Sequence, residues 1–181
     1  MFRFTCILSA SLSGLICFPH GIAYFNVIAG GAVNGYKCLA GSNLDWGQDL
    51  FGLQEWRKAH PLETPFYVAY HGAFDSRLVV ASDRLPESCK HFSQLTPDML
   101  AEAAKVDRYW IAISETFLQG MPGTILYADG SIFVLTQGEM SAFSQLNVVG
   151  RAGYSIKIFH VDRRDVTPTA SAHSGRFRLA R

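Results

Sequence analysis

The chain has 181 residues, of which 49% are hydrophobic and 17% charged, and its formal net charge is +1 at pH 7. This length suits one domain with its own core, and the apolar composition excludes an intrinsically disordered chain. Because 16 Lys and Arg side chains balance 15 Asp and Glu side chains, the sequence has no basic footprint for nucleic acid.

An apolar run opens the chain. Residues 4–18 carry no charged side chain, but the run is shorter than the roughly 20 residues of a spanning helix and is closer to a signal-peptide core. Three serines and a glycine without amphipathic period disfavour a buried core helix. We therefore expect residues 1–18 to be a signal-like or truncated transmembrane segment that associates with a membrane, followed by a connecting loop over 19–35. The soluble part is then extracytoplasmic, in the periplasm.

A strand and a helix are expected next. The short apolar run 36–40 predicts a buried strand, and a helix should follow it. Asp45 suits its N-cap, Gln48 completes a capping box, and Asp49 is favourable in the first turn. Apolar residues then recur at helical spacing, which predicts that they share one face toward the core. These residues are Trp46, Leu50, Leu53 and, at the last position, Trp56 or Arg57.

Strands and helices alternate in the rest of the domain, which we place at residues 36–161. Thr96 followed by Pro97 is typical of a helix start. Asp129-Gly130 is typical of a hairpin, with a loop and a short helix as the alternative. This alternation predicts an α/β fold with a mainly parallel sheet and flanking helices. The other expected elements are strands at 65–70, 109–114 and 153–161, a short strand or loop at 78–81, a short helix at 139–146, and a disordered tail at 162–181.

Motifs for metal or cofactor binding are missing from the sequence. The six histidines show neither an i, i+4 pair nor an H-x-H pattern, and the four cysteines form no C-x-x-C pair. We therefore predict no metal and no cofactor. Cys38 and Cys89 can pair in an oxidising compartment or remain as two buried thiols, and the second alternative is favoured.

One polar cluster remains as a candidate binding site. Carboxylates and amides beside a tryptophan suit a sugar, whose hydroxyls need polar partners and whose C–H face packs on an aromatic ring. The competing interpretation is structural: a capped helix with its tryptophans in the core. His71 follows the next strand and can face the same edge. The candidate binding residues are Asn43, Asp45, Trp46, Gln48, Asp49 and His71.

The segment Ser42-Asn43-Leu44-Asp45-Trp46-Gly47-Gln48-Asp49, preceded by Tyr24-Phe25-Asn26 and Gly30-Gly31, resembles a region of known proteins. It is similar to the C-terminal region of bacterial membrane glycosyltransferases of the dolichyl-phosphate-mannose–protein mannosyltransferase-like group. Short pieces further along, such as Gly153-Tyr154-Ser155-Ile156, occur in the family's order. The resemblance covers about residues 19–161.

The resemblance implies a part of a glycosyltransferase that uses a polyprenyl-phosphate sugar donor. In that family the catalytic acids lie in a multi-helix membrane region that this chain lacks, so no catalytic residue is carried over. We therefore expect a non-catalytic extracytoplasmic C-terminal domain, as a fragment or truncated product, whose partners are a catalytic membrane region or a carbohydrate or protein acceptor. The alternatives are a free-standing periplasmic carbohydrate-binding module and, less favoured, a hydrolase using Asp45 with His71 or Asp75.

Overall fold

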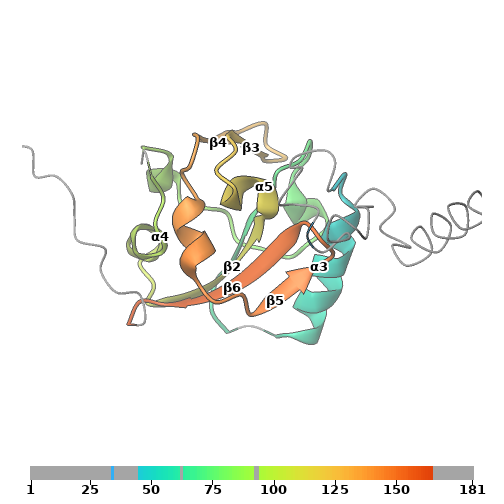
Figure 1. Ribbon diagram of the computed structural model, residues 1–181, viewed down its shortest axis with the longest axis horizontal. Helices are drawn as coiled ribbons and strands as arrows, with labels where there is room; N and C mark the ends of the chain where they lie inside the picture. Colours follow the sequence, from blue (N-terminus) through green and yellow to red (C-terminus); the bar gives the residue numbers. More distant parts are fainter. Residues whose placement is uncertain (1–33, 35–44, 62, 92–93, 165–181) are drawn as a thin grey trace, which may run out of the picture.

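The computed structural model describes residue 34 and residues 45–61, 63–91 and 94–164 (Figure 1). The apolar segment 4–18, the expected strand 36–40 and the tail from residue 165 lie outside these residues. The helices are α3 (Gln48–Ala59), α4 (Pro97–Ala104) and α5 (Glu115–Leu118), with 3₁₀ turns at Ser76–Leu78, Glu87–His91 and Ser141–Gln145. The strands are β1 (Phe66–Ala69), β2 (Arg108–Ser114), β3 (Gly123–Leu126), β4 (Ile132–Leu135), β5 (Gly150–Ala152) and β6 (Ile156–Asp162).

The main sheet has four strands in the order β1-β2-β6-β5. Only β1 and β2 are parallel, with Phe66 beside Trp110, whereas β6 runs antiparallel to both β2 and β5. The predicted α/β class is confirmed, but the prediction of a mainly parallel sheet is wrong. After β2 the chain forms a separate hairpin and a 3₁₀ turn, and it returns through the short β5 and a tight turn into β6, which reverses the strand direction.

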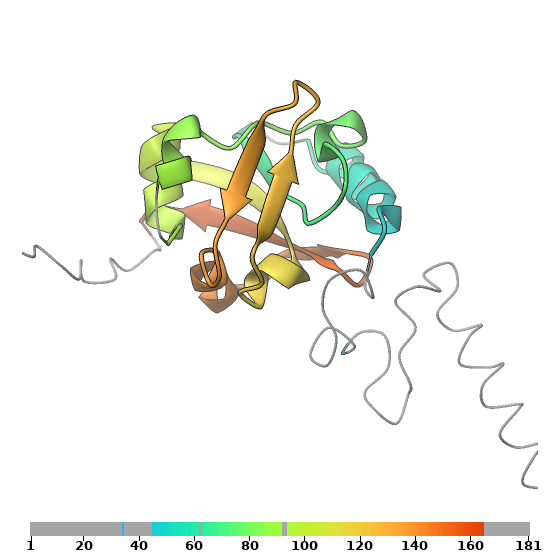
Figure 2. The ribbon, with the colours of Figure 1, turned by 90° about the horizontal axis from the view of Figure 1, so that it is seen from above.

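Two hydrophobic clusters hold the sheet between its covering layers. On one face, Leu50 and Leu53 of α3 are fully buried against a cluster that includes Val68. On the other face, Tyr109 and Ile111 pack beneath α4 and the β3–β4 hairpin. Figure 1 shows α3 and α4 at opposite ends of the sheet, and Figure 2 shows the hairpin crossing over it.

Several local predictions agree with the structure. Thr96 is the N-cap of α4, and its hydroxyl accepts the Met99 N–H at 3.2 Å, with Pro97 at the first helical position. The Asp129-Gly130 turn joins β3 to β4, and Gly130 takes the positive φ of 79° that this turn requires. The last strand extends one residue beyond the predicted end at Val161, and residues 78–81 form no strand.

Cys89 is completely buried in the cluster beneath α4. Burial, with a smaller effect from the Glu139 carboxylate, raises the pKa of its thiol to about 11. This thiol is therefore a core side chain with little thiolate at neutral pH. Its predicted alternative partner, Cys38, lies outside the described residues.

None of the helices in the described ranges combines the length and the apolar character that a membrane crossing requires.

Candidate functional site

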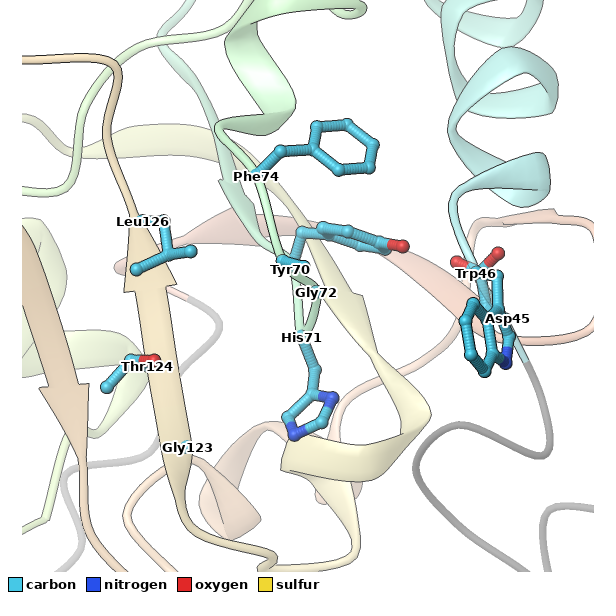
Figure 3. Close-up of a pocket in the computed structure, with 10 residues that line it drawn as sticks. Asp45, Trp46, Tyr70, His71, Gly72, Phe74, Gly123, Thr124 and Leu126 are labelled. Carbon is cyan, nitrogen blue, oxygen red and sulfur yellow. The ribbon is translucent and has the colours of Figure 1, made fainter. Parts of the chain in front are cut away.

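A pocket of about 520 Å³ opens between three segments that are distant in the sequence (Figure 3). Residues 45–46, just before α3, form one wall, and Gly123, Thr124 and Leu126 of β3 form the opposite wall. The loop 70–74, which follows β1, lies between these walls. The volume falls within the roughly 300–1,000 Å³ of typical small-ligand pockets.

Asp45 stands at the junction between the pocket and α3. Its Oδ1 accepts the backbone N–H of Gly47 at 2.8 Å and that of Asp49 at 3.2 Å. The side chain of Gln48 reaches back and accepts the Trp46 N–H at 2.8 Å. Asp45 and Gln48 therefore satisfy backbone donors before and at the helix start, but not in the capping-box arrangement that was predicted, because their partners are Gly47, Asp49 and Trp46. The prediction that Asp45 is the N-cap itself is wrong by two residues, since α3 begins at Gln48 after Gly47.

Gly47 explains this shift of the helix start. Its φ is 107°, a conformation that L side chains rarely adopt. A Cβ at this position would lie 3.1 Å from the Phe74 ring. The glycine thus lets the chain turn sharply into α3 while the loop after β1 packs close to it.

Trp46 was expected in the core, and this expectation is wrong. Its side chain is 71% exposed and lines the pocket. The helical spacing with Leu50 and Leu53 fails because Trp46 precedes the helix and does not follow its periodicity. Trp56, which lies inside α3, does pack against the cluster on that face of the sheet. The exposed indole is the feature that a binding interpretation requires and a purely structural one does not.

Asp49 was a candidate binding residue, but it does not line the pocket. It is fully buried, and its Oδ2 accepts the backbone N–H groups of Tyr154 and Ser155, both at 2.8 Å. Burial raises the pKa of this carboxyl, and the nearby Asp45 charge raises it further. Gly153 makes room for it, because a Cβ there would lie 2.0 Å from the Asp49 carboxyl carbon. Asp49 therefore fastens α3 to the turn between β5 and β6.

Aromatic rings form the floor of the pocket. Tyr70 and Phe74 pack at a centroid distance of 5.9 Å, with Tyr70 only 3% exposed and Phe74 36% exposed. Figure 3 shows the Tyr70 hydroxyl directed toward the side of Asp45. Burial and the Asp45 carboxylate raise the pKa of this hydroxyl well above its usual range. It therefore stays protonated and remains a hydrogen-bond donor at neutral pH.

His71 lies at the end of the pocket beside β3. Its backbone N–H donates to the Ser114 Oγ at 3.0 Å, and its ring packs edge-on against Phe117 at 5.3 Å. Gly123 accommodates the ring, since a Cβ there would lie 2.8 Å from the His71 Cδ2. The predicted proximity of Asp45 and His71 holds to the extent that both line this pocket.

Asp75, the other partner considered for a hydrolase, is occupied elsewhere. Its carboxylate binds the Arg77 guanidinium, with the Arg77 Nη2 at 2.8 Å from Oδ2, and accepts the Ala128 N–H at 2.8 Å. These hydrogen bonds, despite burial, lower the pKa of the Asp75 carboxyl. Asp75 lies outside the pocket lining, so the structure offers no support for an Asp75-based hydrolase.

Of the predicted binding residues, Asp45, Trp46 and His71 meet in the pocket, while Gln48 and Asp49 support its wall. Asn43 lies outside the described residues. The pocket residues of β3 could not be recognised from the sequence, because the sequence of a four-residue hairpin strand is the same kind of pattern whether or not the strand lines a pocket. Within the part of the chain that the structure describes, no group of three or more His, Cys, Asp or Glu side chains could hold a metal ion.

Comparison with protein-family models, with curated proteins and with solved structures found no match to this chain.

Proposed function

We propose that this chain contributes a non-catalytic, extracytoplasmic C-terminal domain to a membrane glycosyltransferase-like system and holds a ligand in the pocket before α3. One observation carries the proposal: Asp45 and Trp46, from the most specific part of the sequence resemblance, line the pocket. The Trp46 indole is 71% exposed at the pocket, where it can contact a ligand. The resemblance implies a polyprenyl-phosphate sugar as the donor of the complete system.

The polar groups of the pocket support ligand binding more than a catalytic role. The Asp45 Oδ1 already accepts two backbone N–H groups, so this carboxylate is committed to the helix start. The described lining contains no serine, cysteine or lysine, and among the described residues the structure shows no base hydrogen-bonded to the Thr124 hydroxyl that would activate it as a nucleophile. Catalysis is accordingly assigned to a separate membrane region, and this domain to holding its acceptor.

The test is the location of the full chain expressed in a Gram-negative bacterium. We expect it to stay with membranes after an alkaline wash and to be digested by protease added to spheroplasts. We also expect the purified chain to transfer no sugar from a polyprenyl-phosphate donor. Resistance to protease in intact spheroplasts, with digestion only after lysis, would overturn the extracytoplasmic assignment. Release of an N-terminally processed protein would overturn the membrane attachment.

A free-standing periplasmic carbohydrate-binding module is the second candidate. It is favoured by the exposed Trp46 indole and by the 36% exposed Phe74 ring in the same pocket. Aromatic faces of this kind pack on the C–H faces of sugars.

Replacement of Trp46 tests this second candidate. If a sugar stacks on the indole, Trp46→Ala should weaken its binding by about tenfold, the value of one good aromatic contact. Phe51→Ala is the matched control, because Phe51 is 63% exposed on α3 and does not line the pocket. Calorimetry with a panel of mono- and disaccharides measures the effect. Equal affinities of the two variants, or no sugar bound by the unmodified chain, would contradict the carbohydrate-binding module.

A further inference from the structure

The edge of β3 that faces the pocket has a distinctive hydrogen-bonding pattern. In an antiparallel pair, hydrogen-bonded and non-hydrogen-bonded residue pairs alternate. The Tyr127 N–H donates to the Ser131 carbonyl at 3.0 Å, which makes 127 and 131 a hydrogen-bonded pair. Counting back along the register, Ile125 and Phe133 are the next such pair. Thr124 and Leu126 therefore direct their backbone N–H and C=O groups away from β4.

Ala128 follows Thr124 and Leu126 in the same two-residue repeat, so its backbone N–H should also point away from β4. Its N–H donates to the Asp75 Oδ2 at 2.8 Å, on the side away from β4. At the other end of the strand, the His71 ring occupies the space that a Cβ of Gly123 would need. Between these two ends, Thr124 and Leu126 line the pocket, and within the described residues neither makes an outward backbone hydrogen bond.

We propose that the pocket binds an extended polypeptide segment, which adds as a strand to this edge of β3. The inference deepens the proposed function, since it names the class of ligand for the same pocket. A peptide main chain supplies both a donor and an acceptor at the two-residue repeat of a strand, about 6.8 Å, which matches the repeat of the outward groups on β3. The ligand strand would lie between β3 and the loop 70–74, both of which line the pocket (Figure 3).

The side chains of the pocket define the peptide further. Tyr70, Phe74 and Leu126 offer apolar surface for one apolar side chain of the ligand. The described lining contributes one carboxylate, that of Asp45, and no lysine or arginine. Charge complementarity therefore favours a peptide that carries a basic residue next to an apolar one.

The experiment begins with a phage-displayed library of random heptapeptides selected on the full chain. We expect enrichment of sequences with a basic residue beside an apolar one, and the most enriched peptide is then synthesised as the probe. Upon its addition, hydrogen exchange of the Thr124 and Leu126 amides should slow, whereas that of the Ile125 amide, already in the ladder, should change little. No enrichment, or no slowing at Thr124 and Leu126, would overturn the proposal.

Two proline variants form a matched pair for the same probe. Thr124 and Val134 are register partners, and each directs its N–H away from the β3–β4 ladder, so proline at either position leaves that ladder intact. We expect Thr124→Pro to weaken peptide binding by about tenfold, the loss of one backbone hydrogen bond, and Val134→Pro to leave it unchanged. Equal effects of the two variants would count against strand addition. If Thr124→Pro fails to fold, the exchange experiment on the unmodified chain decides alone.

A charge variant and a sugar control complete the design. Asp45→Asn keeps an oxygen acceptor for the helix N–H groups and should weaken a basic peptide about threefold, because it removes the one negative charge of the described lining. Sugar binding that Trp46→Ala abolishes and Thr124→Pro does not affect would assign the pocket to carbohydrate instead. Peptide binding by a chain that fails the membrane and protease tests would remove the proposed function and leave this inference standing.

Discussion

Two buried carboxylates, Asp49 and Asp75, perform the same structural task with opposite electrostatics. Each accepts backbone N–H groups from a distant segment: Asp49 from the turn before β6, and Asp75 from Ala128 after β3. Asp75 also has a cation, Arg77, and its pKa is lowered. Burial raises the pKa of Asp49, and the neighbouring Asp45 carboxylate raises it further. The comparison shows that a carboxylate can be retained for its hydrogen bonds even where its charge is unfavourable.

Removal of the Asp49 side chain should produce the largest effect. Asp49→Ala leaves the buried Ser155 N–H and the half-buried Tyr154 N–H without their acceptor, which should reduce the free energy of unfolding by about 3 kcal/mol. Urea unfolding of the purified chain measures this difference. A loss below about 1 kcal/mol would show that water replaces the carboxylate.

Asp75→Ala should have a smaller effect, about 2 kcal/mol, because the Arg77 guanidinium that it leaves behind is 30% exposed and can be hydrated. The same variant frees the Ala128 N–H and so lengthens the outward edge of β3. Chemical denaturation gives the energy, and Arg77→Gln is the control that removes the cation while keeping the carboxylate. If Asp75→Ala lowered the free energy of unfolding more than Asp49→Ala does, the predicted order of the two carboxylates would be wrong.

Replacement by asparagine should give opposite signs at pH 7. Asp49→Asn keeps an acceptor and removes an unfavourable charge, so stability should rise by about 1 kcal/mol, whereas Asp75→Asn should lower it by about 1 kcal/mol because the ion pair is lost. The pH dependence follows the pKa directions. Because the pKa of Asp49 is raised in the folded state, its contribution to the free energy of unfolding grows as pH falls toward the unfolded pKa of 3.8. Because the pKa of Asp75 is lowered, its contribution to the free energy of unfolding disappears as pH falls below 3.8.

Thermal unfolding of the unmodified chain and both asparagine variants between about pH 3 and pH 7 measures these contributions. Asp49→Asn should show its advantage near neutral pH and lose it in acid. Asp75→Asn should begin to approach the unmodified chain at the acid end of this range, below the unfolded pKa of 3.8. Parallel pH profiles for the two variants would mean that neither carboxylate titrates differently in the folded state.

The sequence predicts those elements whose signals are local. The Thr96-Pro97 helix start and the Asp129-Gly130 turn depend on neighbouring residues, and both are found in the structure. The direction of β6 was missed because alternation of strands and helices suggests parallel crossovers, and the three-residue β5 has too little pattern to reveal the return.

In the candidate site, too, features with a local sequence signal were predicted and features that depend on distant residues were missed. Asp45, Trp46 and His71 were singled out by residue type and position after strands, and these three line the pocket. The role of Asp49 was missed because its partners lie 105 and 106 residues away in the chain. Trp46 was placed in the core because the helical period was extended over a residue that precedes the helix.

The close approach of Asp49 to Gly153 constrains how this protein can vary over evolution. Gly153 has a φ of 55°, and the space of its missing Cβ is filled by the carboxylate. A relative with a side chain at this position must therefore carry a smaller or differently directed residue at the position of Asp49. When relatives of the chain are aligned, these two columns should change together, which offers a way to recognise the domain where single motifs are too short.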